Sequence, residues 1–167
     1  MLLQRVKNSV NRFTRTGLLP LFIAARAGSV ECARILIEDG ANVDAETKSG
    51  ASAMHAAASG EMVSLLLEYG ANMNAEDHYG RTPLMSAAEK GSVSATIVLL
   101  GAGCTTNLQS WRTGFSALHY AIHAVQSLYD GPQHIVELLL FHKASSTIVD
   151  LHLQTPLHFA CMEYKAA

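Results

Sequence analysis

The sequence predicts an all-α solenoid of stacked helix-turn-helix units, and three observations carry that prediction. A short phrase, clearest at 82–88 and 155–161, returns in degraded form at 19–25, 52–58 and 116–122. Successive phrases begin 33, 30, 34 and 39 residues apart, and self-similarity at such a period indicates a stacked array rather than one closed core. About ten residues after each of the first four phrases comes an apolar run, which ends at Gly40, Gly70, Gly103 and Lys143.

Each opening phrase carries the signals of a helix N-terminus. Proline occupies the first helical turn, where a missing N–H is tolerated and the fixed φ is already helical, at Pro20, Pro83 and Pro156. A side chain that can accept a hydrogen bond from the first turn precedes the helix at Ser52, Thr82, Ser116 and Thr155. We therefore expect the first helix of each unit to begin at these positions.

Glycine marks the expected end of the second helix in three units. A glycine after the last turn ends a helix in the left-handed conformation without a steric penalty, as expected at Gly40, Gly70 and Gly103. The fourth unit has Lys143 in that place. We expect this unit to end with more backbone strain or with a different turn.

Together these two patterns resemble the ankyrin repeat family over about residues 17–163. That family's unit reads Thr-Pro-Leu-His-x-Ala-Ala, a glycine, a second apolar helix, Gly-Ala-(Asp/Asn) and a hairpin. The resemblance implies an ankyrin-repeat solenoid with projecting β-hairpin loops. It divides the chain into an N-terminal segment, 1–16, and a repeat domain, 17–167, with units at about 17–49, 50–79, 80–112, 113–152 and, in part, 153–167.

The N-terminal segment, 1–16, is predicted to contain an amphipathic helix over Met1–Thr14. Its apolar residues share one helical face, and basic residues surround them: Leu3, Val6, Val10 and Phe13. Three interpretations are open: a helix that caps the apolar end of the stack, the second helix of an upstream repeat, or a mitochondrial targeting segment, because the segment is rich in Arg and free of acids. Import of a reporter fused to residues 1–20 would separate the third from the others.

Three units depart from the pattern. The second is three residues short between His55 and Leu65, so its helices must be shorter or its turn tighter. The fourth has a six-residue insertion within 123–132, where Asp130-Gly131-Pro132 indicates a turn. We expect this insertion to extend the first helix of the unit and to project opposite the hairpins. The fifth ends after its first helix, about 155–165, which is expected to leave Phe159 and Met162 exposed.

Composition narrows the classes of function. The net charge of −2 gives no general attraction to nucleic acid or membrane, and no apolar run reaches the roughly 18 residues of a membrane span. Three cysteines without paired spacing, Cys32, Cys104 and Cys161, favour an intracellular protein of the cytoplasm or nucleus, with mitochondrial import as the alternative. His119 and His123 have the spacing of a metal pair, but His119 holds the repeat's structural His position, as do His55 and His158. We expect no enzyme activity, metal or cofactor.

The resemblance implies a scaffold or adaptor that binds a partner protein through hairpin tips and exposed faces of the first helices. Aromatic and Arg residues are favoured because such residues dominate interface energies, although Trp111 or Phe115 could instead fold back onto the next helix pair. The predicted contact residues are His78, Tyr79, Arg81, Glu89, Lys90, Trp111, Arg112, Phe115, Leu151 and His152.

The identity of the partner is not predicted, but its class is. We expect no nucleic acid, because the stretch 31–77 is acidic. The protein is expected to be monomeric unless its C-terminal end stacks on another molecule. The alternative function is that of a self-assembling or structural fragment of a longer ankyrin array in a multidomain protein.

Overall fold

The computed structural model describes residues 10–125 and 131–163 of the 167-residue chain. In this described part, the regular secondary structure is entirely α-helical and forms nine helices. In chain order they are α2 (Pro20–Ala27), α3 (Val30–Glu38), α4 (Ala53–Ala56), α5 (Gly60–Glu68), α6 (Pro83–Glu89), α7 (Val93–Gly101), α8 (Ala117–Val125), α9 (Gly131–Phe141) and α10 (Pro156–Glu163).

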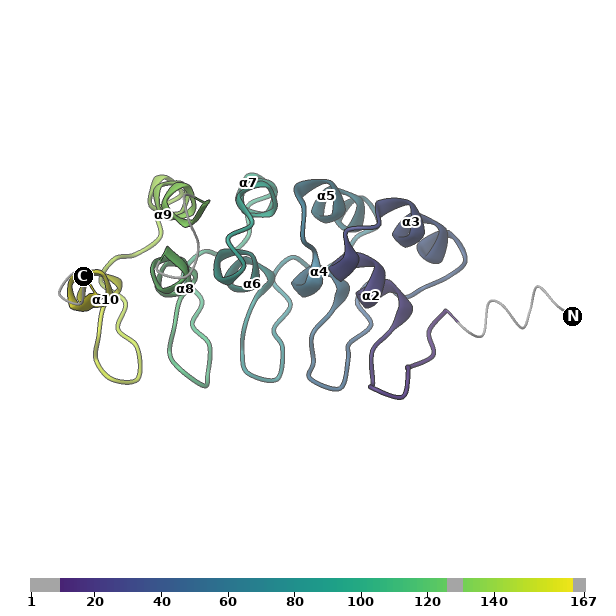
Figure 1. Cartoon of the computed structure of the whole chain (residues 1–167), viewed down its shortest axis with the longest axis horizontal. Coiled ribbons are helices and arrows are strands. Elements are labelled where there is room, and N and C mark those ends of the chain that lie inside the picture. Colours follow the sequence, from purple (N-terminus) through teal and green to yellow (C-terminus); the bar gives the residue numbers. More distant parts are fainter. Residues whose placement is uncertain (1–9, 126–130, 164–167) are drawn as a thin grey trace, which may run out of the picture.

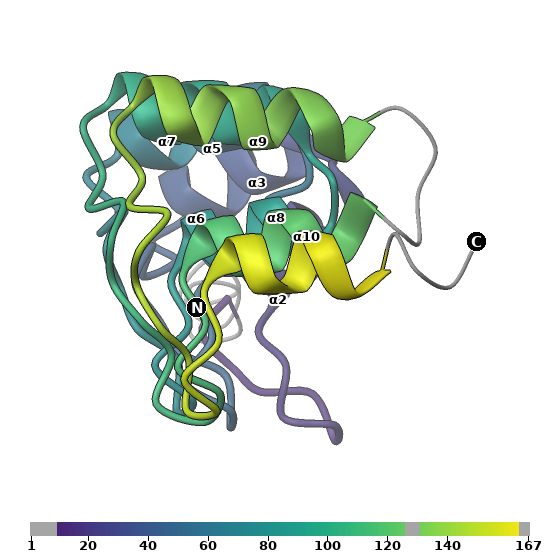
Figure 2. The ribbon, with the colours of Figure 1, turned by 90° about the vertical axis from the view of Figure 1, so that its left-hand side faces the viewer.

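The helices form two parallel rows. The first helices of the units, α2, α4, α6, α8 and α10, follow one another in one row, and the second helices, α3, α5, α7 and α9, lie in the other (Figure 1). Loops that join one unit to the next project together to one side of the rows (Figures 1 and 2). Neighbours pack within each row and between rows, so the predicted solenoid of helix-turn-helix units is confirmed.

The interior runs along the whole stack instead of forming a central core. Alanines with almost no exposed surface, such as Ala25, Ala88 and Ala121, let helices of adjacent units approach closely. Larger side chains, among them Met62 and Leu84, fill the space between the two rows. Each unit therefore buries its apolar surface between its own two helices and against its neighbouring units.

The helix boundaries follow the signals in the sequence. Pro20 and Pro83 stand in the first turns of α2 and α6, and the Thr82 hydroxyl accepts the N–H of Met85 at 3.4 Å. The prediction for Lys143 is also confirmed: its φ is +61°, in the left-handed region that Gly70 occupies in the second unit at +80°. A side chain in this region is strained, because its Cβ crowds the backbone.

The projecting loops differ from the predicted β-hairpins. The described residues contain no β-strand. Each loop is a turn closed at its base by a backbone N–H that donates to a carbonyl across the loop. These bonds join Thr14 to Leu18, Thr47 to Ala51, Asp77 to Arg81, Ser110 to Phe115 and Asp150 to Gln154, at 2.8 to 3.0 Å. We keep the word hairpin for these five loops because each reverses the chain.

Residues 10–16 of the N-terminal segment form a loop that enters the stack. Of the helix expected over Met1–Thr14, residues 1–9 lie outside the described part, and residues 10–14 are turn and irregular backbone. Val10 is buried, and the Asn11 side chain accepts the N–H of Asn42 at 2.9 Å and donates to the carbonyl of Gly40 at 3.0 Å. Asp44, Asn74 and Asn107 each accept a backbone N–H from the following unit in the same way.

The three irregular units have different outcomes. The short second unit has lost helix length, since α4 spans only Ala53–Ala56. In the fourth unit α8 continues to Val125 and α9 begins at Gly131, so the middle of the insertion, 126–130, lies outside the described residues, and its projection stays a prediction.

The fifth unit corrects the expectation for Phe159. Its ring is half-buried, with the ring centroid 5.1 Å from that of Phe115. Leu157 instead has 65% of its surface exposed. The side chain of Met162 lies outside the described part.

Candidate functional site

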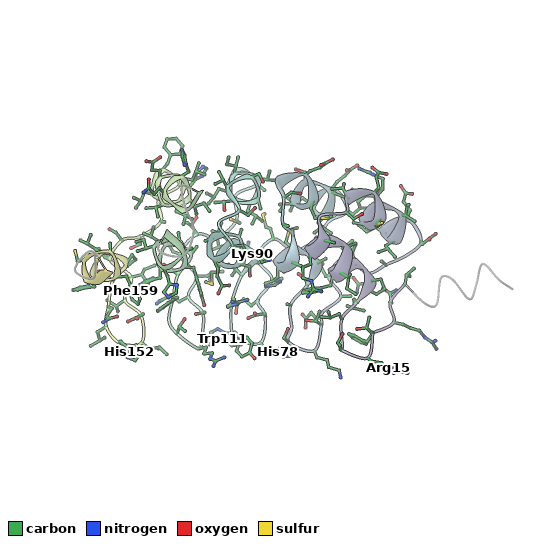
Figure 3. All side chains as sticks on the ribbon, in the orientation of Figure 1. Arg15, His78, Lys90, Trp111, His152 and Phe159 are labelled. Atoms are coloured by element: carbon green, nitrogen blue, oxygen red, sulfur yellow. The ribbon has the colours of Figure 1, made fainter. Side chains whose placement is uncertain are left out.

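The hairpins form one continuous edge. From the second hairpin on, the first tip residue donates its backbone N–H to a carbonyl in the tip of the preceding hairpin. These bonds run from Lys48 to Gly17 at 3.4 Å, His78 to Ser49 at 3.0 Å, Trp111 to Tyr79 at 2.8 Å and Leu151 to Thr113 at 3.1 Å. We call residues 14–18, 47–51, 77–81, 110–115 and 150–154 the hairpin edge; Arg15, His78, Trp111 and His152 mark it in Figure 3.

The tips lie so close together that glycine is required at their contact points. A methyl group on Gly80 would stand 2.7 Å from the Trp111 Cγ, and one on Gly50 would stand 2.5 Å from the His78 ring. Both glycines also have a left-handed φ, near +71° and +79°. The edge is therefore rigid, because each tip is held by a hydrogen bond and by direct contact.

Trp111 is the largest exposed side chain of this edge. Its ring rests on Gly80 of the preceding hairpin, and 66% of its surface remains exposed. The alternative, that Trp111 folds back onto the next helix pair, is wrong. Beside it the Arg112 guanidinium carbon lies 5.4 Å from the centroid of the half-exposed Tyr79 ring, a cation–π geometry.

The last hairpin adds exposed apolar side chains to the hairpin edge. Leu151 and His152 are both exposed, as expected for tip residues. Leu153, which was missed by the sequence analysis, is the most exposed of the large apolar tip residues at 78% and has a φ of +61°. Its signal was available in the alignment of the units, because Leu153 stands where the other four hairpins have glycine.

Arg81 links the hairpin edge to the face of α6. Its Nε lies 3.3 Å from the Asp77 carboxylate, and its guanidinium donates to Glu89 at 2.8 Å. Burial by itself would lower the pKa of Arg81, but the carboxylates of Glu89 and Asp77 raise it above its ordinary value. The predicted contact residues Arg81 and Glu89 are thus already paired with each other, and only their outer surfaces are free for a partner.

Lys90, which follows α6, binds the C-terminal end of the short helix α4 in the preceding unit. Its ammonium donates to the carbonyls of His55 at 2.8 Å and Ala56 at 3.3 Å. Because α4 ends at Ala56, no following helical turn supplies backbone N–H groups to these two carbonyls. Burial, followed by the nearby charge of Arg81, lowers the pKa of Lys90.

Phe115 packs against neighbouring rings and contributes less to the surface. It is half-buried, stacks on His119 with a centroid separation of 5.3 Å and meets Tyr120 edge-on at 5.4 Å. Together with the contact to Phe159, these rings join the fourth unit to the fifth. We therefore leave Phe115 outside the candidate binding surface.

The recurring histidines tie one unit to the next. His55 Nδ1 accepts the N–H of Ser52 at 3.1 Å, so Nε2 carries the proton and donates to the carbonyl of Arg81 at 2.9 Å. His119 makes the same pair of contacts, to Ser116 at 3.2 Å and to Gln154 at 3.2 Å. Burial lowers the pKa of both imidazoles and keeps them neutral.

These contacts occupy the nitrogens that a metal would need. Both ring nitrogens of His119 are hydrogen-bonded, while His123, four residues later, is exposed. Within the described ranges, no group of three or more His, Cys, Asp or Glu residues is placed to hold a metal ion. The structural interpretation of the His119 position is therefore supported by its geometry.

Comparison with known families agrees with this geometry. A family model described as "Ankyrin repeats (3 copies)" matches residues 1–77, 21–110 and 61–150. The chain belongs to the ankyrin repeat family. Ankyrin repeats are generally protein–protein interaction modules and are typically non-catalytic. No curated protein matches the chain. Of the ankyrin helices that the structure describes, none is both long and apolar enough to cross a membrane.

Proposed function

We propose that this ankyrin-repeat protein is a non-catalytic scaffold or adaptor that binds a partner protein. The observation that carries the proposal is the exposed group of Tyr79, Trp111 and Arg112 on the rigid hairpin edge. We expect the partner to bind inside the cell, where the free thiols of all three cysteines would persist.

The physical basis is the kind of side chain and how firmly it is held. Trp, Tyr and Arg contribute most to interface energies when a partner covers them. Trp111 offers one broad apolar face, while its other face is supported by Gly80. Because the hairpin bonds hold the tips in place, little conformational freedom remains to be lost on binding. The neighbouring Leu151, His152 and Leu153 would extend the contact.

Affinity purification from native cells tests this function. The tagged full chain would capture partners, which are identified by mass spectrometry and then measured with purified protein by calorimetry. The double variant Trp111→Ala/Arg112→Ala should weaken binding by more than about tenfold without changing the melting temperature, because both side chains are exposed.

A matched control lies in the other row of helices. Arg34→Ala/Ile35→Ala in α3 also removes an adjacent arginine and a large apolar side chain, with Ile35 exposed by 56%. It should leave the affinity unchanged. A hairpin variant that unfolds more easily but still binds would contradict the proposal.

Self-assembly is the second candidate, and the C-terminal units favour it. Phe141 at the end of α9, Leu153 in the last hairpin and Leu157 in α10 expose 82%, 78% and 65% of their surfaces, so each offers an apolar contact to another molecule. Sedimentation velocity over a hundredfold concentration range distinguishes the two functions. A scaffold stays monomeric without its partner, whereas stacking through this end gives association that Leu157→Glu removes.

A further inference from the structure

Three basic residues gather around the short helix α4. Arg26 lies in the last turn of α2, Lys90 follows α6, and Arg81 precedes α6 and reaches along it to Glu89. Helix α4 packs between α2 and α6 in the row of first helices (Figure 1). We call Arg26, Arg81 and Lys90 the basic cluster; Lys90 is labelled in Figure 3.

The loss of one helical turn in the second unit brings these charges near one another. Where a longer α4 would continue, the chain has Ala57 and Ala58, whose methyl groups cannot screen a charge. Lys90 extends into this place and binds the carbonyls of His55 and Ala56. The positive charge of Arg26 is close enough to contribute to the lowered pKa of Lys90.

The charges of the cluster are only partly balanced. Arg81 is paired with both Asp77 and Glu89. Within the described residues, Arg26 makes no ion pair, and the contacts of Lys90 are to neutral carbonyls. Arg26 on α2 and Lys90 after α6, on either side of α4, therefore form no ion pair with a carboxylate of the described residues.

We propose that the basic cluster binds an acidic segment of the protein partner, with partner carboxylates meeting Arg26 and Lys90. This inference rests on the proposed scaffold function and specifies the class of partner. A carboxylate fits because the guanidinium of Arg26 can donate two parallel bonds to it, while Lys90 adds a point charge from the far side of α4. Complementary charge would guide such a partner onto the first-helix row and set its register.

A peptide is favoured over a nucleic acid by the surrounding charge. The first two units carry nine acidic residues between 31 and 77, which would repel a long polyphosphate chain along its length, but a short acidic segment only where it extends beyond the cluster. Two uncompensated cations suit a short acidic segment, whereas nucleic-acid binding requires an extended basic row.

The test uses the full chain and a defined probe. A fluorescein-labelled octapeptide of alternating Glu and Gly is titrated in 50 mM salt and followed by fluorescence anisotropy. Two comparison probes replace each Glu by Gln or replace the peptide by a twelve-nucleotide single-stranded DNA. The Glu peptide should bind, the Gln peptide should not, and an increase to 300 mM salt should weaken binding about tenfold.

Substitutions place the binding on the cluster. Arg26→Glu should lower the affinity for the Glu peptide by at least about tenfold, because it reverses one of the two charges that contact the peptide without removing a hydrogen bond of the fold. Arg34→Glu in α3, the matched control on the other row, should have little effect. Amide signals of Arg26, Ala58 and Lys90 should shift in a labelled full chain.

Three results would overturn the inference: equal binding of the Gln peptide, equal weakening by Arg34→Glu, or tighter binding of the DNA. Its failure is distinguishable from failure of the scaffold function. If Trp111→Ala/Arg112→Ala releases a captured partner while Arg26→Glu changes neither partner nor peptide, the scaffold function holds and the acidic segment is refuted. If the peptide binds at Arg26 but no partner is captured, the cluster is supported and the scaffold function fails.

Discussion

The third and fifth units begin with the same Thr-Pro-Leu phrase, yet their leucines have opposite environments. Leu84 is 1% exposed between neighbouring units, whereas Leu157 is 65% exposed. The backbone is nearly the same in both, since Pro83 and Pro156 each begin a first helix. Burial in a solenoid therefore depends on the next unit in the stack, and a residue's place in the repeat does not guarantee it.

The hairpins before these two helices also differ, because the later one makes fewer contacts. Asp77 and Asp150 are both buried, and each accepts two backbone N–H groups at one carboxylate oxygen. The other oxygen of Asp77 meets Arg81, but that of Asp150 has no hydrogen-bond partner within the described part of the chain. The fifth unit keeps the repeat's framework with fewer of the contacts that stabilise the third.

The largest expected difference is between the two leucines. Leu84→Ala should lower the free energy of unfolding by about 3 kcal/mol, because it leaves a cavity between the two rows. Leu157→Ala should change it by less than about 0.5 kcal/mol, because its side chain is mostly in water. Urea denaturation followed by circular dichroism measures both. Equal losses would mean that the fifth unit is packed as tightly as the third.

Acid pH should weaken the links between units. Burial lowers the pKa of His55 and His119 in the folded chain, so the unfolded chain binds more protons as the pH falls below the ordinary histidine value of about 6.5. Their contribution to stability is complete above that value and is lost toward the folded pKa values. The melting temperature should therefore fall between pH 7.5 and 5.5.

Substitution identifies the groups responsible for this pH dependence. His55→Gln/His119→Gln should be less stable at pH 7.5 but show a smaller fall on acidification. His158→Gln, at the same repeat position in the fifth unit, is the matched substitution at an exposed side chain. An undiminished fall in the double variant would assign the effect to other groups.

A smaller change should make the fifth hairpin resemble the third. Gln154 occupies the place of Arg81, so Gln154→Arg would bring a guanidinium to the unpaired oxygen of Asp150. We expect a gain of about 1 kcal/mol, typical of a charge-assisted bond at a partly exposed site. Gln154→Met is the control without a charge. No gain from arginine would show that the Asp150 oxygen is inaccessible to the new side chain.

The smallest effect concerns backbone strain. Leu153→Gly should raise stability by about 0.5 kcal/mol, because its φ of +61° is readily adopted by glycine, although glycine also adds entropy to the unfolded chain. Gly80→Ala, with the opposite change in the third unit, should destabilise the chain and displace Trp111. Thermal unfolding of both variants, with Trp111 fluorescence for the second, measures these effects. A loss of stability in Leu153→Gly would show that the backbone of Leu153 is not strained.

Local signals in the sequence determined the units and their helix starts. The prolines that begin α2, α6 and α10 and the glycines after α3, α5 and α7 act through their own backbone, so their roles could be predicted without knowing what packs beside them. The structural role of His55 and His119 and the strain at Lys143 followed from their positions in the repeat. Trp111 and Arg112 could be chosen as surface candidates for the same reason.

Only the tertiary structure decided which contacts cross from one unit to the next. The seat of Trp111 on Gly80 and the reach of Lys90 to the short α4 join residues about thirty positions apart, and no local pattern records them. Their physical cause is stacking: a side chain's exposure and charge partners are set by the neighbouring unit, whose length varies along this chain. That is why the repeat determined the scaffold, while the packing between repeats decided which of its residues remain available to a partner.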